Sequence, residues 1–423
     1  MANSAVLPDQ PLTTADGVPL KTALARALRR DKMKSLALVA PLFIFLGLTF
    51  LMPIGDMLWR GVEDPIVSSY LPKTVEQLKK WDATSGELPD ESAYQALVED
   101  IKAGAPEKLI TRVGKRLNYE LPGMNSLFRK SQRRVPKLDE GPYKEAVIKV
   151  DKKWGQLETW QVINTFSPNL TAGYFWAALD LQVTPAGDLQ LQDEKSRIYL
   201  KLFWRTLYLS GLITLMTLIL GYPVAYLLAT LPLKTSNLLL MLVLLPFWTS
   251  LLVRTTSWIA MLQREGVLND ILVALNVIDN ENRLAMIHNA TGTVVAMTHI
   301  LLPFMILPLY SVMKTIPKSY MRAAVSLGAH PFSAFFKVYA PNTVPGIGAG
   351  GILVFILAIG YYITPALVGG TSGTFISNFI AYHVSQSLNW GLAAALGIIL
   401  LGLVLVLYLL YDRIVGVDNM KLG

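Results

Sequence analysis

The residues on either side of Gly328 have the types and spacing of a docking element rather than of a catalytic site. They predict two short helices joined at this glycine, because glycine often ends a helix in the left-handed conformation. Pro331 can begin the second helix, where its missing N–H is not needed, and Pro341 is expected to end it. The expected apolar faces are Tyr320, Ala323, Ala324 and Leu327 in the first helix, and Phe332, Phe335, Phe336 and Tyr339 in the second. We call residues 314–341 the elbow; its small alanine face suits a groove on a partner protein.

A second set of side chains has the chemistry to contact a charged solute. Arg254 lies inside an apolar segment near its expected outer end, and a charge there is a functional candidate. Its long side chain can equally extend to the membrane interface. Aromatic faces attract ammonium groups, so a solute path can include Trp258, Tyr361 and Tyr362, with Trp248. Interfacial belts and helix packing explain the same aromatic residues, and both interpretations remain open at this stage.

Other chemistry finds little support in the residues. The four histidines show no ligand spacing and the chain has no cysteine, so no metal site is expected. No Walker A sequence is present, and ATP must therefore bind another protein. The run from Gly346 to Gly351 matches a dinucleotide-binding pattern by letter, but it lacks the preceding strand. Gly346 and Gly350 instead predict close helix packing. No cofactor, catalytic residue or nucleic-acid partner is expected.

The composition predicts an all-α membrane protein. Of 423 residues, 52% are hydrophobic and only 16% are charged. A bilayer-crossing helix needs roughly 20 apolar residues. Six stretches of sufficient length lie near 35–56, 203–231, 236–262, 291–313, 343–368 and 389–411.

Charge asymmetry predicts the orientation of these six spans. Basic residues gather before the first span, at Lys21, Arg26, Arg29, Arg30, Lys32 and Lys34. By the positive-inside rule this segment is cytoplasmic. Six crossings then place the C-terminus, with Arg413 and Lys421, on the same side. The elbow, with Lys314, Lys318, Arg322 and Lys337, is also expected there, while the acidic segment 263–290 is expected outside. The first apolar stretch is too long for a cleavable signal peptide.

The long interval between the first two spans predicts a folded, mostly helical extracytoplasmic insertion. Residues 60–199 hold 20 basic and 20 acidic residues, so the net charge of +8 lies elsewhere. Helical spacing follows Asp90, at Tyr94, Leu97, Val98 and Ile101, and recurs at Tyr143, Ala146, Val147, Val150 and Trp154. Alternating leucine and valine around Pro185 predict a β-hairpin. The expected domains are 1–34 (cytoplasmic), 35–56 (first transmembrane helix), 57–200 (insertion) and 201–415 (five-helix transmembrane domain). The insertion either contacts a binding protein or is a peripheral addition that steadies the complex.

The elbow also resembles a known sequence element. Ala323-Ala324, three residues, Gly328, nine residues, Val338 and then Pro341 follow the order of the EAA loop in ABC importer permeases, which contacts the ATPase. Arg322 stands where that family usually has glutamate, Val338 where it has isoleucine, and Ala340 where it has leucine. The resemblance implies that Arg322, Ala323, Ala324, Gly328 and Pro341 belong to an ATPase-coupling loop.

Further stretches of residues 203–415 resemble the first permease subunit of spermidine/putrescine-type ABC importers. These are Leu220-Gly-Tyr-Pro-Val-Ala-Tyr226, Arg264-Glu-Gly-Val-Leu-Asn269, Tyr361-Tyr-Ile-Thr-Pro-Ala-Leu-Val-Gly-Gly370 and Asn389-Trp-Gly391. The resemblance implies a type I importer fold in a bacterial inner membrane. It also implies an ABC ATPase, a second permease and an extracytoplasmic solute-binding protein as partners.

Alternative functions stay open at the sequence level. The long insertion departs from polyamine permeases, so an amino-acid-like solute or another organic cation is an alternative cargo. An ion-coupled secondary transporter is a further alternative, although internal repeats and intramembrane acids are missing. Whether two permeases pair as a homodimer or a heterodimer is also open.

Overall fold

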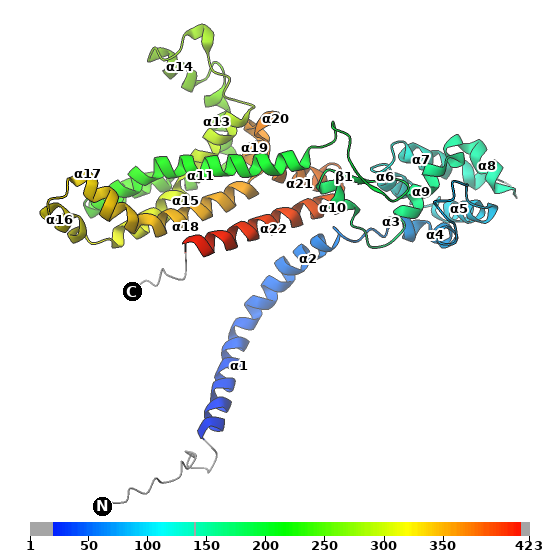
Figure 1. Cartoon of the computed structure of the whole chain (residues 1–423), viewed down its shortest axis with the longest axis horizontal. Coiled ribbons are helices and arrows are strands. Elements are labelled where there is room, and N and C mark those ends of the chain that lie inside the picture. The colour runs from blue at the N-terminus through cyan, green and yellow to red at the C-terminus, as the bar shows by residue number, and fades with distance from the viewer. Residues whose placement is uncertain (1–19, 139–140, 416–423) are drawn as a thin grey trace, which may run out of the picture. The chain divides into compact units, whose positions relative to one another are not determined.

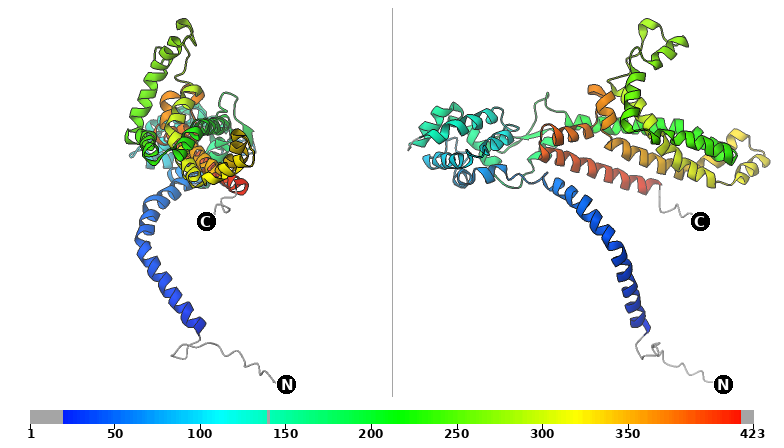
Figure 2. Two further views of the ribbon diagram at one scale, coloured as in Figure 1. Left: turned by 90° about the vertical axis from the view of Figure 1, so that its left-hand side faces the viewer. Right: turned by 180° about the vertical axis from the view of Figure 1, so that it is seen from behind.

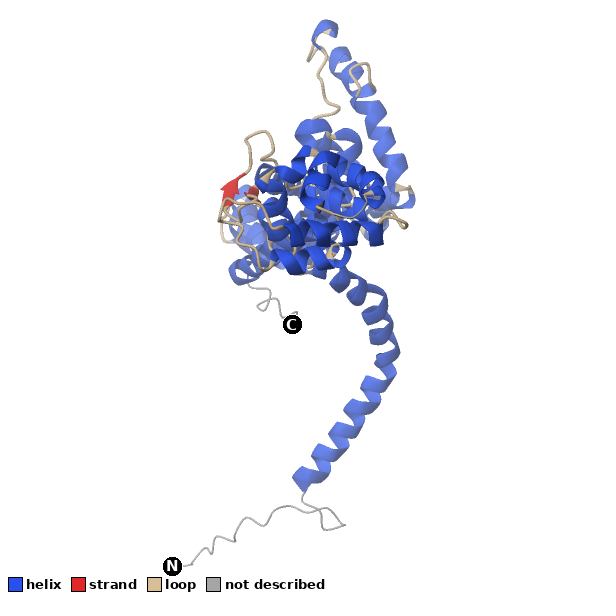
Figure 3. Ribbon diagram, turned by 90° about the vertical axis from the view of Figure 1, so that its right-hand side faces the viewer, coloured by secondary structure: helices blue, strands red, loops and turns tan. Residues whose placement is uncertain are grey.

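The computed structural model describes residues 20–138 and 141–415 and divides into two units, one ending at Trp59 and the other beginning at Arg60. Both units are helical, and the single β-hairpin is the only sheet in the described part of the chain (Figure 3). The prediction of an all-α membrane protein is therefore confirmed.

The first unit is one long helix interrupted by a π-helical turn. It comprises α1 (Leu20–Leu46), the turn Gly47–Leu51 and α2 (Met52–Trp59). The helix begins well before residue 35, where the first span was expected. Residues 20–34 consist mainly of leucine, alanine, arginine and lysine, which favour helix and extend it beyond the apolar stretch. The rest of the expected cytoplasmic segment, residues 1–19, lies outside the described residues, as do residues 416–423 with Lys421.

The second unit begins with the insertion, residues 60–198, which consists mainly of short helices. They are α3 (Ile66–Tyr70), α4 (Pro72–Leu78), α5 (Glu91–Gly104), α6 (Ile110–Leu117), α7 (Met124–Arg134), α8 (Tyr143–Val150), α9 (Leu157–Thr165) and α10 (Gly173–Ala178). Short 3-10 turns cover Val135–Lys137 and Lys152–Gly155. The strands β1 (Leu181–Val183) and β2 (Leu189–Leu191) pair antiparallel, with Leu181 opposite Leu191.

Local patterns in the insertion were predicted with one error. The helix after Asp90 and the hairpin are both confirmed. The helix from Tyr143 was expected to reach Trp154, but α8 ends at Val150 and Trp154 lies in a 3-10 turn. The side chain of Asp151 accepts a hydrogen bond from the Lys153 N–H and begins this turn. The aspartate thus offers the backbone an alternative to continuing the helix.

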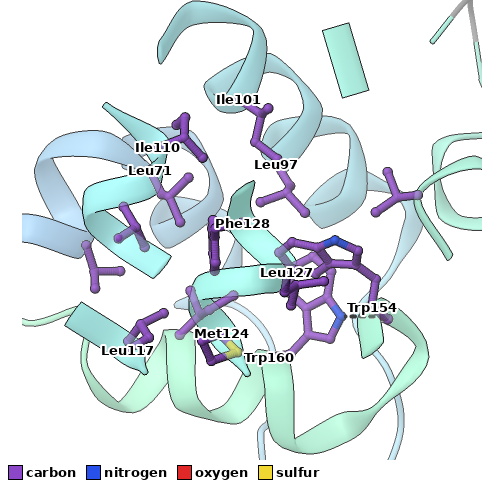
Figure 4. Packing of buried hydrophobic residues seen from close by; sticks show 14 of the residues in the cluster. Leu71, Leu97, Ile101, Ile110, Leu117, Met124, Leu127, Phe128, Trp154 and Trp160 are labelled. Carbon is purple, nitrogen blue, oxygen red and sulfur yellow. Dashed lines mark hydrogen bonds between the residues drawn. The ribbon is translucent and has the colours of Figure 1, made fainter. Parts of the chain in front are cut away.

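A closed aromatic core holds the insertion together (Figure 4). Trp154 and Trp160 are fully buried, and their ring centroids lie 5.4 Å apart. The Trp154 carbonyl accepts hydrogen bonds from Tyr94 Oη at 2.8 Å and from Trp160 Nε1 at 3.0 Å. Trp154 Nε1 donates to Ser131 Oγ at 2.9 Å. Burial raises the pKa of the Tyr94 hydroxyl to about 12, so this network keeps its protons throughout the physiological pH range.

A buried ion pair fastens the start of the insertion to α6. Arg116 contacts the Asp64 carboxylate through Nε and the Glu120 carboxylate through Nη1 at 2.6 Å. Its guanidinium also lies 4.8 Å from the Tyr174 ring centroid. Burial alone lowers the pKa of Arg116, but Tyr174, Asp64 and Glu120 outweigh it and raise the pKa above its usual value. The charge is therefore held inside the domain with its counter-ions.

The insertion is joined to the following helix by a carboxylate cap. Both oxygens of Asp180 accept backbone N–H groups at the start of α11, namely those of Ile198, Tyr199 and Leu200, at 2.9–3.1 Å. A helix N-terminus leaves such donors unpaired and favours negative charge. Tyr119 Oη also donates to the Ser387 carbonyl at 3.1 Å. The link therefore uses specific polar contacts from two separate parts of the insertion.

The bundle follows the insertion. Its helices are α11 (Tyr199–Thr230), α12 (Leu233–Leu244), α13 (Leu251–Leu262), α14 (Val267–Ala274), α15 (Ala290–Thr315), α16 (Lys318–Ser326), α17 (Pro331–Ala334), α18 (Ala340–Gly360), α19 (Ile363–Val368), α20 (Gly370–Gly373), α21 (Ile376–Ser385) and α22 (Trp390–Val415). Short turns cover Leu245–Trp248, Asn280–Asn282 and, in π-helical form, Phe335–Tyr339. The views in Figure 1 and Figure 2 agree that α11, α15 and α18 run side by side.

Glycines bring α18 close to α15, as predicted. A Cβ added at Gly346 would lie 3.2 Å from the Leu309 Cα, and one added at Gly350 would lie 3.1 Å from the Met305 carbonyl oxygen. Larger side chains would therefore push the helices apart. Lipid tails are as apolar as leucine, so close backbone packing of this kind holds membrane helices together.

The predicted spans agree with the structure at four positions and differ in form at two. Within the described residues, five helices are long and apolar enough to cross a membrane, and a bent pair makes a possible sixth. The bent pair, Leu233–Trp248 and Leu251–Leu262, covers the expected span 236–262, but it turns by 95°. The expected span 343–368 is a helix from Pro331 to Gly360 followed by the separate α19.

Candidate functional sites: a docking elbow and a polar cluster at two helix breaks

The first half of the elbow has the cap that the sequence predicts. Gly328 has φ +91°, in the left-handed region. Its N–H donates to the Val325 carbonyl at 3.0 Å, and the Ala329 N–H donates to the Ala324 carbonyl at 3.0 Å. These two bonds form a Schellman motif, which closes the C-terminus of α16. The prediction of a left-handed glycine between two helices is confirmed.

The second half of the elbow corrects the role predicted for Pro341. The helix that begins at Pro331 does not end there; it passes through a π-helical turn, Phe335–Tyr339, and continues as α18 to Gly360. A proline ring clashes with the carbonyl four residues earlier, here Lys337, which lies inside that turn. The wider turn relieves the clash and lets the chain remain helical. The elbow and α18 are consequently one continuous element.

Aromatic rings seat the elbow against the bundle. The ring centroid of Phe335 lies 5.5 Å from that of Tyr226 and 6.3 Å from that of Tyr222. Tyr339 is buried against Tyr226 at 5.3 Å. The predicted apolar face of this helix is therefore divided, because Phe332 is 69% exposed.

The outer surface of the elbow is exposed and mixed in character. Leu327 is 89% exposed, next to the glycine cap. Arg322 and Ala323 are exposed and Ala324 is half-buried. An exposed apolar patch on a short helical elbow is a feature of interaction sites. The predicted coupling residues Arg322, Ala323, Ala324 and Gly328 thus lie together, whereas Pro341 lies beyond the π-turn within the continuous helix.

The second candidate site lies where two helices are interrupted. One interruption is Thr249–Ser250, between α12 and α13, and the other is Tyr361–Tyr362, between α18 and α19. Thr255 of α13 and Thr364 of α19 are buried, and their hydroxyl oxygens are 3.1 Å apart. Ser377 Oγ of α21 donates to the Tyr361 carbonyl at 2.6 Å. Hydroxyl groups thus join the two helices that follow the interruptions, and one of them satisfies a carbonyl at the second interruption.

Charged and aromatic side chains line this region. Trp258 Nε1 donates to His299 Nδ1 of α15 at 3.1 Å, and the two rings meet edge to face. Arg254 lies one helical turn before Trp258 and interacts electrostatically with both His299 and Tyr361. Its Nε is buried and has no hydrogen-bond partner among the described residues. We call Arg254, Trp258, His299 and Tyr361 the polar cluster.

The polar cluster joins residues that the sequence suggested separately. Arg254, Trp258 and Tyr361 come together, whereas Tyr362 and Trp248 are exposed and Trp248 makes no ring contact within the described residues. His299 was missed. A histidine in the otherwise mostly apolar run Val294–Pro303 was the available signal, but its partner Trp258 lies 41 positions away. No group of three or more metal-ligating side chains occurs among the described residues.

Comparison with known proteins identifies the family of this chain. Residues 203–416 match the family model described as "Binding-protein-dependent transport system inner membrane component". The chain belongs to this family. It is therefore a transport subunit rather than an enzyme, and it belongs to the inner-membrane permeases. The elbow and the polar cluster lie inside the matched region, whereas the first span and the insertion precede it.

The chain is similar to several proteins named as permeases of transport systems. The chain is 35% identical over 224 residues to the "Spermidine/putrescine transport system permease protein PotB" of Haemophilus influenzae, covering 53% of this chain and 78% of that protein. It is 36% identical over 222 residues to the protein of the same name in Escherichia coli, covering 52% and 80%. The "Inner membrane ABC transporter permease protein YdcU" of E. coli is 31% identical over 222 residues, covering 50% and 70%.

Solved structures give a more distant likeness. A chain from a "bacterial ABC transporter involved in the import of the acidic polysaccharide alginate" aligns with 54% of this permease and 81% of its own length, at 19% identity and a TM-score of 0.42.

Proposed function

We propose that this permease is the membrane subunit of an ATP-driven, binding-protein-dependent importer and that its cargo is a small amine, specifically a polyamine such as spermidine or putrescine. The exposed elbow carries the proposal of ATP coupling, because the chain has no nucleotide-binding sequence of its own. The names of the two spermidine/putrescine permeases at 35% and 36% identity support the cargo.

The continuous helix supports a mechanism of coupling. An ABC ATPase docks on Arg322, Ala323, Ala324 and Leu327, and its movement displaces the elbow. Because Pro331–Gly360 is one helix, displacement at the elbow moves the opposite end at Gly360. That end adjoins Tyr361 in the polar cluster. A rigid element between two sites is a physical means of transmitting such a change.

The polar cluster supports a role in the solute path. Trp258, Tyr361 and Tyr362 present aromatic faces, which attract ammonium groups. Interrupted helices leave backbone groups that commonly line transporter binding sites. A second permease, identical or different, completes the path. A soluble binding protein delivers the amine from outside, and the insertion forms part of its landing surface.

The cargo and the energy source are tested together by uptake. Cells that lack the transporter are complemented with the intact complex, and labelled putrescine or spermidine uptake is competed with unlabelled amines and amino acids. If only polyamines compete with the labelled solute, the proposal is supported. If amino acids compete, the cargo is an amino-acid-like solute instead. Reconstitution of this permease alone, followed by accumulation driven by an ion gradient, would establish a secondary transporter instead.

The partners are tested by co-purification and mass spectrometry from native membranes. We expect an ATPase, a permease and a binding protein in the eluate. Ala324→Asp should release the ATPase, since it places an unpaired charge in the docking face. Ser326→Asp serves as the control, because Ser326 is exposed beside the cap. Equal recovery of the ATPase with both variants would show that the Ala324 face does not contact the ATPase.

The orientation is tested in the cysteine-free background. Both termini and the elbow are proposed to be cytoplasmic, and the insertion external. Ser92 and Ser326 are exposed, so Ser92→Cys should react with an impermeant maleimide in intact cells whose outer membrane has been permeabilised. Ser326→Cys should react only after lysis. The reverse pattern inverts the topology.

A further inference from the structure

Arg254 is a half-buried charge without a counter-ion among the described residues. It lies close to the N-terminus of α13, where the helix dipole disfavours a cation. Its Nε is buried and unpaired, and no ion pair of Arg254 occurs in the described part of the chain. Burying a charge is costly unless it is paired or hydrogen-bonded. An anionic partner in the assembled transporter would satisfy the enclosed Nε and pair the half-buried charge.

The bundle itself cannot supply that partner. Its only acidic residues are Glu265, Asp270, Asp279, Glu281 and Asp412. Four of them lie in the segment beyond α13, where Asp270 pairs with Arg283 at 2.9 Å. Asp412 lies at the far end of the last helix, α22. The neighbouring Trp258 offers only an N–H donor, and His299 Nδ1 already accepts that hydrogen bond.

The proposed cargo cannot neutralise Arg254 either, a step that rests on the proposed function. A polyamine is a cation and is repelled by an arginine in a partly desolvated site, where charge interactions are stronger than in water. With its charge neutralised, the arginine leaves the faces of Trp258 and Tyr361 available to an ammonium group. A permease for amines thus requires a counter-ion at this position.

The surface around Arg254 fits a second protein. Leu252 and Val253 precede it and are 59% and 56% exposed, and Trp248, before the bend, is 78% exposed. Exposed apolar side chains next to Arg254 in the chain, together with one unpaired cation, are complementary to an apolar helix face carrying one carboxylate. Acidic residues inside membrane helices are rare and usually paired, so such a carboxylate is a specific partner.

We propose that Arg254 forms an intersubunit ion pair with an intramembrane carboxylate of the second permease subunit. The pair aligns the two permeases beside the polar cluster and neutralises Arg254 on the amine path. Charge complementarity also selects the partner, because two cations or two carboxylates at this contact repel each other. Two copies of this chain would place arginine near arginine, so the pair favours a heterodimer.

The proposed ion pair is tested by measuring how strongly the two permease subunits associate. The complete complex is purified with Arg254→Gln, and dissociation of the second permease is followed during dilution in detergent. We expect dissociation to be favoured on the order of thirtyfold or more, as when one member of a buried charge pair is removed. Arg254→Lys should retain most of the association. Arg264→Gln, at an exposed arginine of the neighbouring segment, should have no effect.

A charge exchange identifies the partner residue. Arg254→Asp is combined with arginine at each intramembrane acidic position of the second permease in turn. Restored association in one combination confirms the pair. Normal association of Arg254→Gln overturns the proposal: unchanged uptake then indicates a side chain that reaches the interface, and altered cargo competition indicates direct cargo contact. An effect that depends on anionic lipid overturns it in favour of a lipid phosphate.

A matched variant distinguishes a pair between subunits from a pair within one chain. Asp56 of the first unit is an acid near the end of an apolar helix in this chain and already takes part in an interaction. Dissociation of the second permease by Asp56→Asn, equal to that caused by Arg254→Gln, assigns the pair to one chain and overturns the proposal. Failure of polyamine uptake by the unaltered complex refutes the cargo, while the association measurements still decide the ion pair.

Discussion

The insertion and the bundle bury their large side chains to very different degrees. Trp154, Trp160 and Phe128 of the insertion are fully buried in one core. In the bundle, Trp248 and Leu327 are largely exposed, as are many leucines of α12. The insertion closes its apolar surface by itself, whereas the bundle leaves much apolar surface exposed, as expected for helices in a membrane.

The solvent of each region explains this difference. In water, burial of apolar surface drives folding, so the insertion gains stability from every aromatic ring that it encloses. In a bilayer no comparable force acts between apolar helices, and close packing and polar contacts hold them instead. The bundle accordingly uses Gly346 and Gly350 against α15, and hydroxyl contacts such as that between Thr255 and Thr364.

Removal of a core tryptophan should have the largest effect. Trp154→Ala leaves a cavity and deletes the hydrogen bond to Ser131, and we expect the insertion to lose roughly 3–5 kcal/mol of unfolding free energy. Membrane insertion of the bundle should be unchanged. Trp248→Ala is the matched control and should not lower stability, because that ring is exposed. The stability of both variants is measured by thermal unfolding and limited proteolysis of the purified permease. Equal losses of stability would contradict the difference in burial between the insertion and the bundle.

Loss of the buried arginine in the insertion should have an effect nearly as large. Arg116→Met leaves the Asp64 carboxylate buried and unpaired, at a cost of about 3–5 kcal/mol. In the double variant with Asp64→Leu, much of that stability should return, because that carboxylate is then gone as well. Denaturant unfolding of the insertion in all four combinations measures the coupling. A double variant no more stable than Arg116→Met contradicts an ion pair.

Substitution at the elbow should separate stability from function. Gly328→Val places a β-branched side chain in the left-handed region, which costs about 1–2 kcal/mol locally. Nothing lies within 4 Å of the added Cβ, so expression and membrane insertion should stay normal. ATPase-coupled uptake should be lost, because the angle between α16 and α17 changes. Ser326→Val controls for the added bulk, and normal uptake in Gly328→Val removes the coupling role.

The smallest expected effect concerns the link between the two regions. Tyr119→Phe deletes the hydrogen bond to the Ser387 carbonyl, which contributes about 0.5–1.5 kcal/mol. Hydrogen exchange should rise at residues 386–389 and stay unchanged in the core around Trp154. Increased exchange throughout the insertion would mean that its fold depends on the bundle.

Features that depend on near neighbours were predictable from the sequence. The left-handed cap at Gly328, the hairpin around Pro185 and the helix after Asp90 each depend on residues within a few positions. The close approach at Gly346 and Gly350 was also predictable, because small residues four positions apart in a membrane helix are typical of close helix–helix packing. The membrane class followed from length and hydrophobicity alone.

Features that depend on packing were not predictable. Proline rules predicted an end at Pro341, but the π-turn that accommodates it is stabilised by Phe335 and Tyr339 packed on Tyr226 of a distant helix. The 95° bend between α12 and α13 replaced an expected straight span.

Hydrophobicity and backbone preference are properties of short segments, so the membrane helices, the capped elbow and a folded insertion could be predicted from the sequence. The continuity of the elbow with α18, and the contact of Trp258 with His299 beside an Arg254 that has no ion pair among the described residues, emerge from the tertiary structure alone. Those contacts join residues from separate helices, and their distances depend on how the helices pack rather than on any local pattern.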